Sequence, residues 1–155
     1  MKITICAVGR LRKSPERELI DDYLSRFEKS GRGMGLGPAQ LIEVEDKKGL
    51  GQEAEAQLLS RAIPDGSVIV SLDERGSLIS SPEFAQKLET WRDAARDVTF
   101  VIGGADGIAP DLRAKADFSI SFGKMVWPHM LARVMLAEQI YRAGQIIAGT
   151  PYHRV

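Results

Sequence analysis

Short apolar runs rich in β-forming residues alternate along the chain with helical segments, and this alternation limits the fold more than any other feature of the sequence. The run at 2–8 is followed by helical periodicity over 14–30, where Ser14 and Pro15 stand in the order typical of a helix start. The later segments are expected as strands at 40–45, 67–73, 97–103 and 118–122, and as helices at 52–63, 80–95, 110–116 and 128–147. Strands that alternate with helices favour an α/β fold with a mostly parallel sheet.

The length and composition indicate one globular domain that spans residues 1–155. Hydrophobic residues make up 44% and charged residues 27% of the chain, which is typical of a protein with an ordinary buried core. The N-terminal apolar run is too short for a signal peptide and no stretch approaches the length of a membrane span, so we expect a cytoplasmic protein. Cys6 is the only cysteine, which excludes an intrachain disulfide and a thiolate metal cluster and favours a small buried side chain in a strand.

The charge balance limits the class of partner. The chain carries 21 basic and 21 acidic residues, so its formal net charge is zero. A nucleic acid would therefore have to meet a local basic patch, which counts against a non-specific DNA or RNA binder but not against an enzyme that contacts a single RNA site. The basic residues available for such a patch, which a solvated surface explains equally well, are Arg10, Arg12, Lys13, Arg32, Lys47 and Lys48.

A loop with three glycines, GGADGIAP at 103–110, follows the fourth expected strand. It lacks the Gly-Lys-Ser/Thr of a Walker loop, and its spacing differs from the G-x-G-x-x-G of a dinucleotide loop. Asp106 within the loop would repel a phosphate. We therefore interpret the loop as part of a site for a ligand with a flat ring or a positive centre, and a tight turn whose glycines only supply positive φ is the alternative.

Ligands of parallel α/β sheets bind outside the carboxyl ends of the strands. Three loops of this chain are expected there. They are the loop after Asp73, where Glu74, Arg75 and Gly76 are expected to end the strand, the loop after Ile102 and the loop after Phe122. A ligand site is therefore expected at these loops.

The C-terminal third, residues 127–155, holds both histidines of the chain, His129 and His153. On the expected helix, Glu138, Arg142 and Gln145 fall on one face. The rest of this helix is apolar on more than one side, so we infer a dimer interface, and a fully buried core helix is the alternative. The other polar side chains that accompany the histidines are Arg133, Arg154 and Tyr152.

Each of these polar side chains also has a purely structural interpretation. His129 follows Pro128 near the helix start, where a histidine can act as a cap, and Glu138 with Arg142 can form an ordinary ion pair. Residues at the end of a chain are commonly disordered. Two histidines without suitably placed carboxylates or thiols predict no metal site, and the lack of a G-x-S-x-G elbow argues against a Ser–His–Asp hydrolase.

Three stretches together resemble the RlmH family: KITICAVGR near the N-terminus, VIGGADG at 101–107 and SFGKMVWPHMLARVMLAEQIYRAGQIIAGTPYHR at 121–154. Members of this family are small SPOUT-class methyltransferases that methylate N3 of a pseudouridine in 23S ribosomal RNA. The resemblance spans the whole chain and implies an α/β fold with a C-terminal trefoil knot, a homodimer, and S-adenosylmethionine held at the subunit interface. The chain departs from the family pattern at Ala105, where many relatives have proline, and at Trp127, where a smaller apolar residue is expected.

The resemblance also implies, by position, which residues form the site. The cofactor contacts fall on Leu72, Gly103, Gly104, Phe122, Gly123, Lys124, Met125, Val126 and Trp127. The catalytic candidates, arginines to stabilise an imide anion and a histidine as the base, are His129, Arg142, His153 and Arg154. Glu138 and Tyr152 are expected to contact the substrate. The short C-terminal tail is expected to complete the active site of the partner subunit.

Two alternatives compete with methyl transfer. A non-catalytic ribosome-associated protein that keeps the fold predicts a degraded cofactor pocket. A nucleotide-binding module of flavodoxin type predicts loops that favour phosphate, and Asp106 speaks against it. If the chain is a methyltransferase, its zero net charge predicts that the RNA substrate is a structured ribosomal site or the assembled ribosome, whose shape supplies affinity that this small protein lacks.

Overall fold

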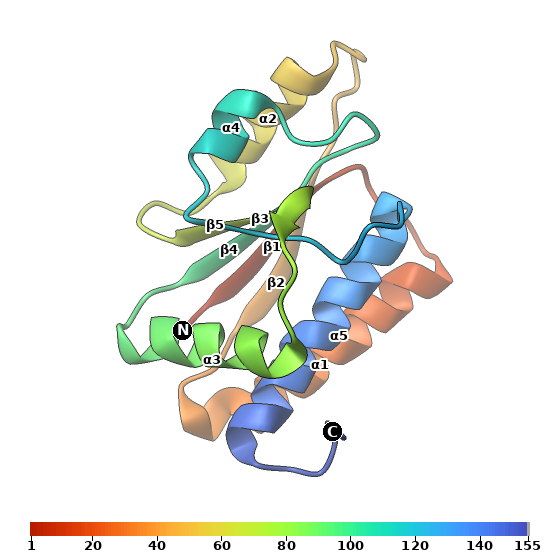
Figure 1. Ribbon diagram of the computed structural model, residues 1–155. Helices are drawn as coiled ribbons and strands as arrows, with labels where there is room; N and C mark the ends of the chain where they lie inside the picture. The colour runs from red at the N-terminus through yellow and green to blue at the C-terminus, as the bar shows by residue number, and fades with distance from the viewer. Residues whose placement is uncertain (155) are drawn as a thin grey trace.

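A computed structural model describes residues 1–154 and shows a five-stranded sheet between two layers of helices (Figure 1). The strands are β1 (Ile3–Val8), β2 (Ala39–Val44), β3 (Val68–Ser77), β4 (Val98–Ile102) and β5 (Phe118–Ile120). Their order in the sheet is β2-β1-β4-β3-β5, and every neighbouring pair is parallel. The predicted parallel α/β fold is therefore confirmed.

Helices cover both faces of the sheet. Figure 1 shows α1, α3 and α5 on one face and α2 and α4 on the other. The helices are α1 (Pro15–Gly31), the 3-10 turn η1 (Arg32–Met34), α2 (Gln52–Ala62), α3 (Ser81–Asp93), α4 (Pro110–Ala114) and α5 (His129–Ala148). Within the described part of the chain, none of them is both long and apolar enough to cross a membrane.

The strand side chains divide between two cores because successive residues of a strand point to opposite faces. Ile3, Ile5 and Ala7 of β1 pack under α1, α3 and α5. Cys6 and Val8 pack under α2 and α4. Cys6 is fully buried, as expected, and burial raises the pKa of its thiol to about 11.

Two helices begin as their sequences predict. The Ser14 hydroxyl accepts a hydrogen bond from the Arg17 amide at 3.2 Å, and Pro15 occupies the first turn. At the start of α3, Ser80 and Glu83 form a capping box in which each side chain accepts from the other's amide. These local interactions explain why both helix starts could be placed from the sequence.

β3 is longer than the sequence indicates. The prediction that Glu74, Arg75 and Gly76 end this strand is wrong, because β3 continues to Ser77. After an irregularity in register, Ser77 returns to pair with the same β5 residue that Leu72 faces, Ile120. A Cβ atom on Gly76 would lie 2.7 Å from the backbone carbonyl carbon of Ile120, so the close approach of the two segments requires glycine.

We predict that Gly76→Ala lowers the free energy of unfolding by about 1–3 kcal/mol, because the added methyl group meets backbone that cannot turn away. Denaturant unfolding followed by circular dichroism measures the change. Gly33→Ala is the matched control, since a Cβ at Gly33 meets nothing within 4 Å. Equal unfolding midpoints for Gly76→Ala and Gly33→Ala would contradict the close approach of Gly76 to the β5 backbone.

Candidate functional site

The middle of β3 and the loops that follow β4 and β5 line one cavity of about 340 Å³. Of the nine residues predicted to contact a cofactor, eight line it: Leu72, Gly103, Gly104, Phe122, Gly123, Met125, Val126 and Trp127. Lys124 belongs to the same segment but is not among the lining residues. The parallel sheet places these separate segments together because its strands end at one edge.

The glycine loop folds back on itself at the wall of this cavity. The Gly107 amide donates to the Gly104 carbonyl at 3.0 Å, and Gly107 has a φ of +77°. A Cβ on Gly103 would lie 2.5 Å from the Gly107 carbonyl carbon. The glycines therefore serve a tight turn, and the same turn presents the Gly103 and Gly104 backbone to the cavity.

Three carboxylates and two arginines, Arg75 and Arg113, line the cavity beside the glycine loop. Asp73, Glu74 and Asp106 line the cavity, and Asp73 lies 3.7 Å from Arg113. Behind the loop, burial raises the pKa of the Glu55 carboxyl, with further contributions from Asp106 and Asp46. This surrounding disfavours a phosphate and suits a ligand with a positive centre.

Of the charged residues of the cavity, the sequence pattern singled out Asp106 but not Asp73, Arg75 or Arg113. Asp73 directly follows the apolar stretch of β3, and its position after a buried strand is the signal that could have identified it. Arg75 and Arg113 also line the cavity. Arg113 lies on the short helix α4, where nothing in the local pattern distinguishes it from a solvated side chain.

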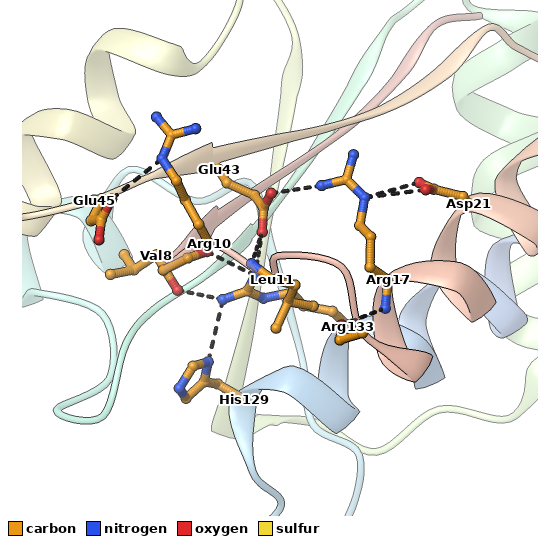
Figure 2. A network of polar contacts seen from close by, with 11 residues as sticks. Val8, Arg10, Leu11, Arg17, Asp21, Glu43, Glu45, His129 and Arg133 are labelled. Carbon is orange, nitrogen blue, oxygen red and sulfur yellow. Dashed lines mark hydrogen bonds and ion pairs between the residues drawn. The ribbon is translucent and has the colours of Figure 1, made fainter.

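A buried arginine fixes the start of α5 next to this cavity. Arg133 is fully buried, and its guanidinium donates to the Val8 carbonyl and to Glu43, the latter at 3.0 Å (Figure 2). It also donates to the Gly9 carbonyl at 2.9 Å. Glu43 also accepts from Arg17 at 2.6 Å. One network therefore joins α5, the end of β1, β2 and α1. The sequence alone does not distinguish Arg133 from the other arginines of the C-terminal third.

His129 is the first residue of α5 and lines the cavity. Its Nδ1 lies 3.3 Å from Nη2 of Arg133. The ring therefore packs against the buried network (Figure 2) and forms no side-chain cap of the helix. Burial, and then the positive charge of Arg133, lower the pKa of His129. The imidazole is consequently held neutral at physiological pH.

The other predicted catalytic and substrate residues gather at the far end of α5. Arg142 donates to both carboxylate oxygens of Glu138, at 2.8 and 3.0 Å, and its Nη1 lies 3.1 Å from Nδ1 of His153. The Tyr152 hydroxyl donates to Glu138 at 3.1 Å, and burial with the nearby carboxylate raises the pKa of Tyr152 to about 12. The tail is thus held against the helix up to His153, while Arg154 is exposed.

Gln145 does not join this group, although its spacing placed it on the same helix face. Its amide donates to the hydroxyl of Ser30 at 3.0 Å, and its carbonyl oxygen accepts from Thr150 at 2.7 Å. The side chain is buried between α1 and the turn that ends α5. Its role is therefore to anchor the base of the C-terminal tail.

The predicted site residues form two groups along α5, one at its first residue and one from the middle of the helix to the tail that follows it. Thirteen residues separate His129 from Arg142 on α5, and a rise of about 1.5 Å per residue places them about 20 Å apart along the axis. The structure therefore brings His129 to the cavity but leaves Glu138, Arg142, Tyr152 and His153 away from it. Among residues 1–154, no group of three or more His, Cys, Asp or Glu side chains is arranged to hold a metal ion.

Known proteins match the whole chain. A family model described as "Predicted SPOUT methyltransferase" matches residues 1–153. A protein of Ruegeria sp. named "Ribosomal RNA large subunit methyltransferase H" is 67% identical over 156 residues, and one of the same name from Cereibacter sphaeroides is 65% identical over 155 residues. Both alignments cover 100% of each chain.

A solved structure shares the fold. A probable methylase family protein from Haemophilus influenzae Rd KW20 superposes with a TM-score of 0.53 at 13% sequence identity. The alignment covers 99% of this chain and 70% of that one. At so low an identity, the likeness concerns the fold alone.

The lowered pKa of His129 predicts how stability depends on pH. Since the unfolded chain takes up this proton near the ordinary value of 6.5 and the folded chain only at lower pH, the free energy of unfolding should fall as the pH drops below 6.5. We expect the free energy of unfolding of His129→Gln to fall less over this pH range, because the variant has no imidazole at position 129. Urea titrations between pH 7.5 and pH 5 measure the free energy of unfolding, with His153→Gln as the control. If this free energy changed equally with pH in wild type and in His129→Gln, the depressed pKa would be refuted.

Proposed function

Since the chain belongs to the SPOUT methyltransferase family, we propose that it transfers a methyl group from S-adenosylmethionine to N3 of a pseudouridine in 23S ribosomal RNA. The observation that carries the proposal is the cavity between β3 and the loops after β4 and β5, in a chain matched from end to end by large-subunit methyltransferases. Residues 1–155 act as one domain. The site of action is the cytoplasm, where ribosomes are assembled.

The residues of the cavity fit S-adenosylmethionine. Its positive sulfur and amino group suit the carboxylates of Asp73 and Asp106, whereas a phosphate ligand, as in a flavodoxin-type module, does not. Apolar side chains of Leu72, Met125 and Val126 suit a flat purine ring. The cofactor supplies a methyl carbon activated by the positive charge on sulfur. The cavity is open and the tight glycine turn at its wall is formed, which favours the enzyme over a non-catalytic ribosome-associated protein.

The chain's polar side chains supply the acceptor chemistry. An imide nitrogen attacks only after it has lost its proton, and the resulting negative charge spreads onto the two flanking carbonyl oxygens. We assign contacts with the nucleobase that receives the methyl group to Arg142, Arg154, His129 and His153. Glu138 and Tyr152 complete these contacts. Donors preorganised toward the developing charge lower the barrier of such a reaction.

A homodimer would unite the two groups of site residues. The tail cluster around Arg142 lies about 20 Å from the cavity along α5 of its own chain, so a second copy must bring its tail to the cavity. Leu78, Met130 and Leu131 are exposed apolar side chains around the start of α5 and α3, as a dimer interface requires. We assign the composite site to this interface. Each chain is expected to form the trefoil knot of the family beside it.

The substrate is a structured ribosomal site rather than free RNA. A chain with equal numbers of acidic and basic residues lacks the positive field that drives binding to free RNA. The large subunit or the assembled ribosome supplies a shape that two small subunits can recognise.

The first test is cofactor binding followed by methylation. We expect calorimetric titration to give a dissociation constant of about 1 µM for S-adenosylmethionine, or about −8 kcal/mol. Gly103→Ala should weaken it at least tenfold, because its methyl group opens the glycine turn, and Gly33→Ala should not change it. Labelled methyl groups should then appear in 23S RNA of ribosomes from a deletion strain. A well-folded protein that binds no cofactor would overturn the proposal.

The composite site is tested by mixing inactive chains. Arg154→Ala removes a tail group and Gly103→Ala damages the cavity, so each variant alone should be inactive. After equal amounts are unfolded and refolded together, about one quarter of the wild-type rate should return, because half of the dimers are mixed and each carries one intact site. No recovery in mixtures shown to contain mixed dimers would mean that the tail acts on its own chain's cavity.

A further inference from the structure

Both histidines of the chain meet an arginine through the same ring nitrogen. Nδ1 of His129 lies 3.3 Å from Nη2 of Arg133, and Nδ1 of His153 lies 3.1 Å from Nη1 of Arg142. A guanidinium only donates hydrogen bonds, so Nδ1 must accept in both pairs. The single proton of each neutral ring then resides on Nε2.

The two arginines are held in place by other partners. Arg133 is fully buried and donates to the carbonyls of Val8 and Gly9 and to Glu43. Arg142 is held by both carboxylate oxygens of Glu138. The buried Arg133 guanidinium cannot turn away to let an imidazolium N–H take the place of the Nδ1 lone pair, so protonation of His129 sets two cationic donors against each other.

We propose that His129 contacts the target base as a neutral Nε2–H donor rather than as the general base, and that Arg133 is the positioning residue that fixes this tautomer. The geometry of His153 with Arg142 assigns the same donor role to the tail histidine. This role rests on the proposed function, since it concerns the base that is methylated. It reverses the expectation that one of the histidines removes the imide proton.

The chemistry balances without a protein base. The imide proton leaves to water before the transfer, and the negative charge spreads over N3 and its two carbonyl oxygens. The Nε2–H of His129 donates to one of these oxygens. The N3 electron pair then forms the bond to the methyl carbon while the carbon–sulfur bond breaks and its electron pair stays on sulfur. His129 stabilises the anion throughout and exchanges no proton.

The charged surroundings of His129 support a neutral ring. Arg133 contacts it directly, and the Glu43 carboxylate is hydrogen-bonded to Arg133. Burial and Arg133 both lower the pKa of His129, so the neutral form predominates at the pH of the cytoplasm. The other charged side chains that line the same cavity are Asp73, Glu74, Arg75, Asp106 and Arg113.

The tautomer can be measured on the ligand-free protein. In a long-range ¹⁵N–¹H spectrum at pH 7.5, we expect Nδ1 of both histidines at the shift of an unprotonated nitrogen and Nε2 at the shift of a protonated one. His129→Gln and His153→Gln assign the signals. In Arg133→Lys, which keeps a donor and a positive charge but loses the fixed fork, the His129 signals should move toward the average of a tautomer mixture. A proton on Nδ1 of His129 in the wild type would overturn the proposal, whatever the activity.

The donor role is measured by single-turnover methylation of ribosomes. A glutamine amide can place an N–H near the position of Nε2, whereas asparagine places it near Nδ1. We expect His129→Gln to retain activity within about tenfold of wild type and His129→Asn and His129→Ala to lose about 10²–10³. In both wild type and His129→Gln, the methylation rate should rise with pH until the pH reaches the pKa of the imide N–H.

The two measurements separate the two possible failures. A rate that levels off near the pKa of His129 in the wild type, together with a His129→Gln as inactive as His129→Ala, would identify a histidine base and refute the donor role. A wild type that shows the Nε2–H tautomer but methylates no ribosomes would leave the ring assignment standing and refute the proposed function instead. Circular dichroism of each variant checks that the loss of activity does not come from unfolding.

Discussion

The buried guanidinium of Arg133 is the interaction on which the site depends. It enters from α5 and donates to the last carbonyls of β1 and to Glu43 of β2, which also accepts from Arg17 of α1. Within the described residues, Nε is its only buried nitrogen without a hydrogen-bond partner. Removing one partner of a buried ion pair costs about 3–5 kcal/mol, so the helix start cannot shift cheaply. Because His129 lies one turn before Arg133, the network also sets the position of the ring at the cavity.

The parallel sheet and the glycine turn supply the rest of the cavity. Strands that end at one edge bring Leu72, the Gly103–Gly104 turn and the segment from Phe122 to Trp127 together, although about 50 residues of sequence separate them. Gly76 and Gly103 permit backbone approaches that a Cβ atom would prevent. The carboxylates at the wall then select the charge of the ligand. The glycines thus set the shape of the cavity, and the carboxylates set its charge.

The length of α5 keeps two groups of predicted site residues apart within one chain. His129 and its cavity lie at the start of the helix, and the cluster of Glu138, Arg142, Tyr152 and His153 lies near its end. A straight helix cannot bring these two groups together, so the composite site that we propose needs a second chain. In each group, an arginine with its own carboxylate partner orients a histidine through Nδ1.

The sequence by itself determined the order of strands and helices, the parallel sheet, the helix starts at Ser14 and Ser80, and the segments that line the cavity. These features follow from local periodicity, capping and turn chemistry, and from the rule that parallel strands place their ends together. Only the tertiary structure decided that β3 continues through Gly76, that Arg133 reaches Val8 and Glu43, and that the predicted catalytic residues fall into two groups. These facts depend on contacts between residues some 40 to 125 positions apart, and such contacts leave no periodic trace in the sequence.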